Sequence, residues 1–276
     1  MSSTRFLPTS HSFPQSHGSV AVPHKVNLQP TSSPQRPQPP LQNAFVLNWE
    51  DVLAPMTWLH ERIGLRPSRQ ALAHAQLLVA SKPYLQQALS AVEAQIIELL
   101  RIASAMGPTY VVTERSLKYM DATCTSFFPY LALWLRHPGN DSCVRVLAAP
   151  QTKFASDMEK AAWRVDLLQS ICRDSVARNA HAEVQQRMLR SPEFGTMGLV
   201  HVSASEMDTF ACVKAIDVAP FLLPKCVYLR HQQQQQQSQQ QYQESLSLEE
   251  FFAQLQMLQR YLVSAAAHSS AFAVNL

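Results

Sequence analysis

The sequence predicts an α/β fold: a Rossmann-like, three-layer α/β/α sandwich around a mainly parallel central sheet. Short apolar, β-branched runs alternate along the chain with segments of helical periodicity. The runs are apolar at consecutive positions and not at every second one, which is typical of parallel strands buried on both faces. We expect strands at 44–48, 109–113, 144–148, 199–203 and 226–229.

The helical segments show apolar residues three or four positions apart. The clearest of them stops at Gly107-Pro108, a pair that ends helices. Between the first strand and this helix lie only a few tens of residues, which is too little chain for a large cap domain. We expect helices at 85–103, at about 156–189 with one break, after Ser205, and at 248–265.

Two segments of biased composition set the limits of the domain. Residues 1–43 are rich in Pro, Ser and Gln and contain no acidic residue. Such a segment cannot bury enough apolar surface to offset its ordering entropy, so we predict a disordered tail. The glutamine-rich stretch at 231–246 is typical of an expanded surface loop. The α/β domain is therefore predicted to span 44–265, with a C-terminal tail at 266–276.

Composition argues against several classes of partner and cofactor. The formal net charge of +3 is too small to indicate a nucleic-acid partner, and no apolar run approaches the ~20 residues that span a bilayer. The five cysteines are scattered without a CxxC pair, so neither a zinc site nor a disulfide framework is expected. These features favour a cytoplasmic protein. The acid-free amino terminus leaves an organellar transit peptide open as the alternative.

Polar residues follow three of the predicted strands. The runs are Asn48 to Asp51, Thr113 to Arg115, and Ser203 to Asp208. In parallel sheets, ligands bind outside the carboxyl ends of the strands, so these runs hold the candidate site residues. The first strand ends on an amide, Asn48, where a carboxylate would be expected of a catalytic site.

The order of elements and several short motifs resemble the haloacid dehalogenase (HAD)-like hydrolase superfamily. One of its subgroups has a first motif that reads Asp-Trp-Asp-Asp-Thr-Leu-Leu-Pro, followed by a Trp-Leu pair. The corresponding stretch here is Asn48-Trp49-Glu50-Asp51-Val52-Leu53-Ala54-Pro55, with Trp58-Leu59 after it. The resemblance covers roughly 44–265 without the glutamine-rich stretch, and it continues at 110–113, 127–129, 162–164 and 202–205.

The resemblance implies a phosphoryl-transfer site with four elements. An aspartate on the first strand attacks phosphorus, and a second aspartate two residues later acts as acid and base. A Ser or Thr and a helical Lys hold the phosphoryl oxygens, and an acidic residue after the fourth strand helps to hold Mg²⁺. At these positions the chain has Asn48, Glu50, Thr113, Arg164 and Ala204, of which only Thr113 matches.

We therefore expect a catalytically inactive, HAD-like domain that serves as a binding or regulatory module and needs no cofactor. The resemblance implies a protein or a phosphorylated macromolecule as its partner. The alternative is a Mg²⁺-dependent phosphatase with a rearranged set of carboxylates, for which the metal candidates are Glu50, Asp51 and Asp208. At the position of the family's lysine, Lys160 or Lys153 could serve instead of Arg164.

Three of these residues could instead have purely structural roles. Thr113 could cap the helix that follows it, and Asp51 could be an N-cap or turn residue. Arg164 beside Trp163 could lie on a solvated helix face.

Overall fold

The central sheet of the computed structural model has six strands, all parallel, in the order β3-β2-β1-β4-β5-β6. The structure describes residues 42–137, 144–150, 154, 156–179, 197–215, 217, 222–229 and 246–276. The strands are β1 (Gln42–Asn48), β2 (Thr109–Thr113), β3 (Val144–Ala148), β4 (Met197–Ser203), β5 (Leu222–Tyr228) and β6 (Phe272–Asn275).

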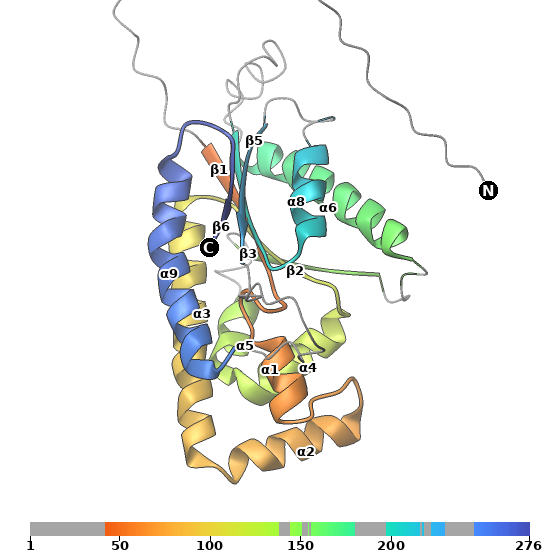
Figure 1. Ribbon diagram of the computed structural model, residues 1–276, viewed down its shortest axis with the longest axis vertical. Helices are drawn as coiled ribbons and strands as arrows, with labels where there is room; N and C mark the ends of the chain where they lie inside the picture. Colours follow the sequence, from red (N-terminus) through yellow and green to blue (C-terminus); the bar gives the residue numbers. More distant parts are fainter. Residues whose placement is uncertain are drawn as a thin grey trace, which may run out of the picture. The chain divides into compact units, whose positions relative to one another are not determined.

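Helices cover both faces of this sheet (Figure 1). Long helices α3 and α9 lie side by side on one face, and α6 and α8 lie on the other. The predicted three-layer α/β arrangement with a parallel sheet is therefore confirmed. The helices in the described residues are α1 (Met56–Arg62), α2 (Arg69–Ala80), α3 (Pro83–Met106), α4 (Leu117–Phe127), α5 (Pro129–Arg136), α6 (Asp157–Asn179), α8 (Glu206–Ala215) and α9 (Leu248–Ala267).

Strand β1 shows why the sequence has continuous apolar runs. Phe45 and Leu47 belong to the hydrophobic cluster shared with α3 and α9. Ala44 and Val46, which point to the opposite face, belong to the cluster shared with α6 and α8. Because both faces are covered, the four consecutive positions from Ala44 to Leu47 are all apolar and buried.

Helix α3 follows its predicted pattern closely. It starts with Pro83 in the first turn, where a missing N–H costs nothing, and its apolar stripe is buried against the sheet and α9. A Cβ atom at Gly107, just past its end, would lie 2.0 Å from the backbone oxygen of Asn43. Glycine is therefore the residue that lets the chain enter β2 so close to β1.

A buried lysine joins β5 to the end of α9. Lys225 Nζ donates to Asn43 Oδ1 and to the Ala266 carbonyl oxygen, both at 3.0 Å, and the side chain has no exposed surface. Burial lowers the pKa of Lys225 to about 8. The cluster occupies the space beside Gly198, where a Cβ atom would lie 2.3 Å from Asn43 Oδ1.

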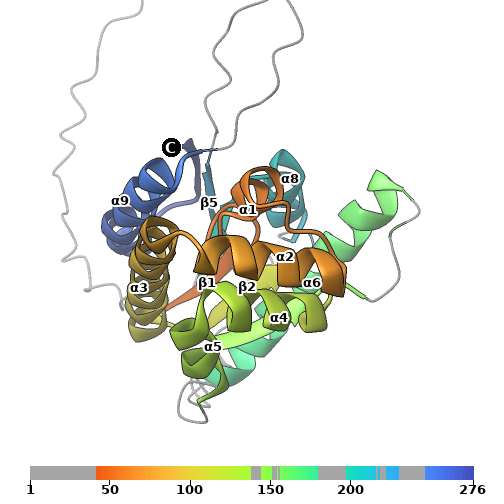
Figure 2. The ribbon, with the colours of Figure 1, turned by 90° about the horizontal axis from the view of Figure 1, so that it is seen from below.

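Four shorter helices, α1, α2, α4 and α5, gather at the end of the sheet where the strands finish, as the view from below shows (Figure 2). They had no individual counterpart in the sequence prediction. Helices α1 and α2 are the whole helical content between β1 and α3, a segment that the structure describes completely. In the described part of the chain, no helix is both long enough and apolar enough to cross a membrane.

The ends of the domain differ from the predicted limits. Strand β1 begins at Gln42, so the domain starts before residue 44. Residues 266–276, expected to form a tail, contain the end of α9 and the edge strand β6, which pairs with β5. The predicted disorder of residues 1–41, the glutamine-rich loop up to residue 245 and the helical segment beyond 179 lie outside the described residues.

Candidate functional site

The predicted site lies where three neighbouring strands end. Asn48 is the last residue of β1, Thr113 of β2 and Ser203 of β4, and β1 is flanked by the other two in the sheet. From β1 the chain first adds β2 and β3 on one side and then crosses to β4 on the other. This reversal is the topological switch point, where the loops diverge and α/β proteins bind their ligands.

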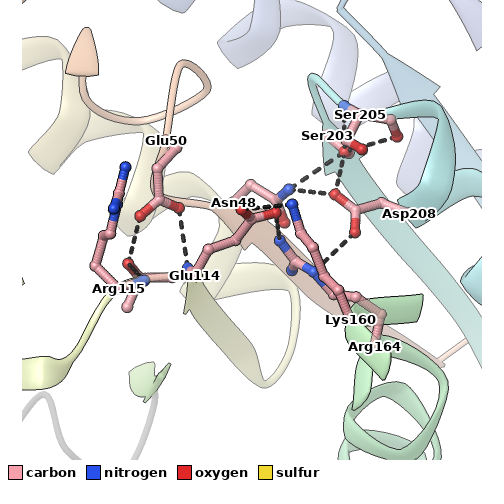
Figure 3. Close-up of polar contacts among 10 residues, drawn as sticks. Asn48, Glu50, Glu114, Arg115, Lys160, Arg164, Ser203, Ser205 and Asp208 are labelled. Atoms are coloured by element: carbon pink, nitrogen blue, oxygen red, sulfur yellow. Dashed lines mark hydrogen bonds and ion pairs between the residues drawn. The ribbon is translucent and has the colours of Figure 1, made fainter. Parts of the chain in front are cut away.

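Asn48 is tied to the opposite side of this switch point. Its Nδ2 group donates to Asp208 Oδ2 at 2.6 Å and to Ser203 Oγ at 3.2 Å (Figure 3). The Ser203 hydroxyl also donates to Asp208 Oδ2, at 2.6 Å. Asp208 lies in the first turn of α8, so these contacts join β1, β4 and α8.

The orientation of the Asn48 amide follows from its neighbour. A carboxylate only accepts hydrogen bonds, so the NH₂ group must face Asp208 and the carbonyl oxygen must face away. Among the described residues, that buried Oδ1 atom has no hydrogen-bond partner. Burial alone would raise the pKa of Asp208, but Arg164, His201 and the hydrogen bonds from Ser203 and Asn48 lower it below its usual value.

Arg164 is buried, and the interpretation as a solvated helix residue is wrong. Only 3% of its side chain is exposed, and its Nε atom lies 3.0 Å from Asp208 Oδ1. Its Nη2 group donates to Glu114 Oε1 at 2.9 Å. Lys160, one turn earlier on α6, places Nζ 2.7 Å from Glu114 Oε2. The four side chains therefore alternate in charge across the site: Lys160, Glu114, Arg164, Asp208.

Glu50 and Thr113 form a second group at the end of β2. The Thr113 hydroxyl donates to Glu50 Oε1 at 2.5 Å, and the backbone N–H of Glu114 donates to Oε2 at 3.2 Å. Burial raises the pKa of Glu50 above its usual value despite these hydrogen bonds. Thr113 does not cap the next helix, because Ser116 is the N-cap of α4.

Asp51 and Ala204 have structural roles. Asp51 adopts a positive φ of 56°, a conformation that Asp tolerates better than most residues. Its carboxylate accepts from the Thr57 N–H at 2.8 Å and from the Thr57 hydroxyl at 2.6 Å. Asp51 is thus a turn residue that holds the first turn of α1, whose N-cap residue is Pro55. Ala204 packs against the hydrophobic cluster on the α3 and α9 side.

The residues at this site do not fit the Mg²⁺ ion that the family resemblance implies. Asp208 is already neutralised by Arg164, and Asn48 turns its NH₂ group towards it. The metal candidates Glu50, Asp51 and Asp208 each have a different partner. In the described part of the chain, no three His, Cys, Asp or Glu side chains are grouped to hold a metal.

Sequence reasoning missed three members of the site. Ser203 and Glu114 belong to the polar runs that follow the predicted strands, so their position could have identified them, but no role was predicted for either. His201, on β4, is buried, and the Nε2 atom has no hydrogen-bond partner among the described residues. Burial lowers the pKa of His201 to about 4, against the opposing effect of Asp208. The sequence gives no indication that a histidine within an apolar strand belongs to the site.

No protein-family model, no curated protein and no solved structure matches this chain.

Proposed function

We propose that this protein is a catalytically inactive, HAD-like domain that acts as a binding or regulatory module. The observation that carries the proposal is the contact between Asn48 and Asp208 beside the Arg164 guanidinium. The motif-like positions, far apart in the sequence, converge at the carboxyl ends of β1, β2 and β4, which supports the resemblance.

The chemistry of the residues disfavours hydrolysis. In the chemistry that the resemblance implies, a negatively charged carboxylate oxygen at this position attacks phosphorus, and Asn48 supplies a neutral amide whose NH₂ group is engaged. Glu50, at the acid/base position, is held by Thr113 and by the Glu114 N–H. Loss of a covalent nucleophile costs several powers of ten in rate, at ~1.4 kcal/mol each.

The alternative is a Mg²⁺-dependent phosphatase that uses Glu50, Asp51 and Asp208 in a new arrangement. It requires these carboxylates to leave their present partners, Thr113, Thr57 and Arg164. Breaking the buried pair between Asp208 and Arg164 is the most costly of these changes, because it leaves the buried guanidinium with Glu114 as its single remaining counter-charge among these residues.

A hydrolysis assay tests the proposal. The full chain is assayed on a generic aryl phosphate with Mg²⁺, next to Asn48→Ala and the double variant Asn48→Asp/Ala204→Asp, which restores both missing carboxylates. We expect no turnover above the buffer rate for the natural protein or for Asn48→Ala. Activity gained by the double variant would support the HAD-like assignment. Turnover by the natural protein that Asn48→Ala leaves unchanged would contradict the proposal and favour the alternative.

A further inference from the structure

Two cations of the site, the half-buried Lys160 and the buried Arg164, share one carboxylate. Lys160 Nζ and Arg164 Nη2 approach the two oxygens of Glu114 at 2.7 and 2.9 Å. Figure 3 shows the Glu114 side chain turned towards both of them and away from Glu50. An ammonium and a guanidinium that converge on one set of oxygens are the donors that also recognise phosphate groups.

We infer that Lys160 and Arg164 form an anion-binding site for a phosphate monoester and that Glu114 occupies this site as an internal substitute for the ligand. The inference deepens the proposed function, because it says what the inactive site binds and how access to it is limited. A phosphorylated partner binds by displacing the Glu114 carboxylate from the two cations.

The charges explain why the displaced state would attract an anion. With Glu114 in place, the two cations are balanced by Glu114 and Asp208. When Glu114 turns away, Asp208 still pairs with Arg164 Nε, and one positive charge is left in excess. The Nη2 group of Arg164 and the Nζ group of Lys160 are then both available to a phosphate.

A ligand in solvent can reach the Glu114 side chain, because exposure increases from Arg164 at the inner end of the site to Lys160 and Glu114. The Arg164 side chain is 3% exposed, whereas those of Lys160 and Glu114 are 26% and 28% exposed. Glu114 thus lies at the border of the site, with solvent on one side and the guanidinium on the other. Its backbone stays anchored, because its N–H donates to Glu50, so only the side chain has to move.

Phosphate binding to the full chain tests the inference. Inorganic phosphate is titrated calorimetrically at constant ionic strength into the natural protein and into Glu114→Gln. We expect Glu114→Gln to bind phosphate at least tenfold more tightly, and Glu114→Gln/Lys160→Gln to lose that gain. Glu114→Asp, which keeps the charge on a side chain one methylene shorter, should gain affinity by a smaller factor and serves if the glutamine variant fails to fold.

The matched control is Asp121→Asn, which also removes one negative charge, from an exposed ion pair with Arg136. We expect its affinity to equal that of the natural protein. Equal affinities for the natural protein and both Glu114 single variants would overturn the inference and leave the proposed lack of activity untouched. A gain in Asp121→Asn as large as in Glu114→Gln would also overturn it. Aryl phosphate turnover by the natural protein would contradict the proposed function alone.

Discussion

Asn48 Nδ2 donates to Asp208 Oδ2 at 2.6 Å and so joins the end of β1 to the first turn of α8. The contact pairs a donor with an acceptor, and Arg164 Nε lies at the other oxygen of the same carboxylate. A second carboxylate at position 48 would face Asp208 directly, with one guanidinium to share. The amide at the end of β1 is therefore matched to its neighbour.

Changing Asn48 to Asp should reverse this complementarity. In Asn48→Asp the two facing carboxylates raise each other's pKa above the unfolded value of about 4. The variant should then match the natural protein at low pH and lose stability as the pH rises through the raised pKa. We expect a deficit of about 2 kcal/mol in the free energy of unfolding at pH 7.5.

Urea denaturation at pH 4.5 and pH 7.5 measures this deficit. Asn275→Asp, the same exchange at an exposed position of β6, is the control and should show no such pH dependence. A deficit that is equal at both pH values would mean that position 48 does not face an ionised carboxylate.

Removing the carboxylate of Asp208 should be costly. In Asp208→Asn the buried Arg164 keeps Glu114 but loses its second counter-charge, and we expect the free energy of unfolding to fall by about 3 kcal/mol. Chemical denaturation gives the value. Asp217→Asn breaks an exposed pair with Lys214 and should change stability by less than about 0.5 kcal/mol. A loss below about 1 kcal/mol in Asp208→Asn would show that the buried pair is not formed.

Lys225 should make stability depend on pH in the alkaline range. Its pKa is about 8 in the folded protein and 10.5 as an ordinary lysine, so between these values the unfolded chain binds more protons. The free energy of unfolding should therefore rise with pH from about 8 to 10.5, by on the order of 2 kcal/mol from this group. Denaturation across this range, compared with Lys225→Met, isolates the effect. Parallel pH profiles for both proteins would contradict it.

The fold could be predicted because strands that are buried on both faces have runs of consecutive apolar residues in the sequence. Strands β2 and β3 have their predicted limits. Strand β2 is buried at every position, whereas β3, at the edge of the sheet, has Arg145 exposed among its apolar residues. Strand β6 was missed because Phe272–Asn275 is short and alternates between half-buried and exposed residues, so it lacks that continuous pattern. A four-residue strand at the edge of a sheet depends on its neighbour, β5, more than on its own sequence.

The site was predicted in position but not in its contacts. Asn48 and Thr113 were found because strand ends are visible in the sequence. The role of Arg164 was not, because a charged residue on a helix gives no sign of burial. Only the packing of α6 beside β2 and α8 places it between Glu114 and Asp208. Likewise, the direction in which Glu114 turns depends on the loop after β2, which no residue pattern specifies.

The central claim is tested most directly by a calorimetric titration of Mg²⁺ into the natural protein, as the full 276-residue chain. The account predicts no saturable binding, because Arg164 already serves as the counter-cation of Asp208 and Asn48 presents its NH₂ group. Saturable one-site binding that disappears in Asp208→Asn would contradict the account, since it would show that this carboxylate holds a metal and that the site retains the means for catalysis.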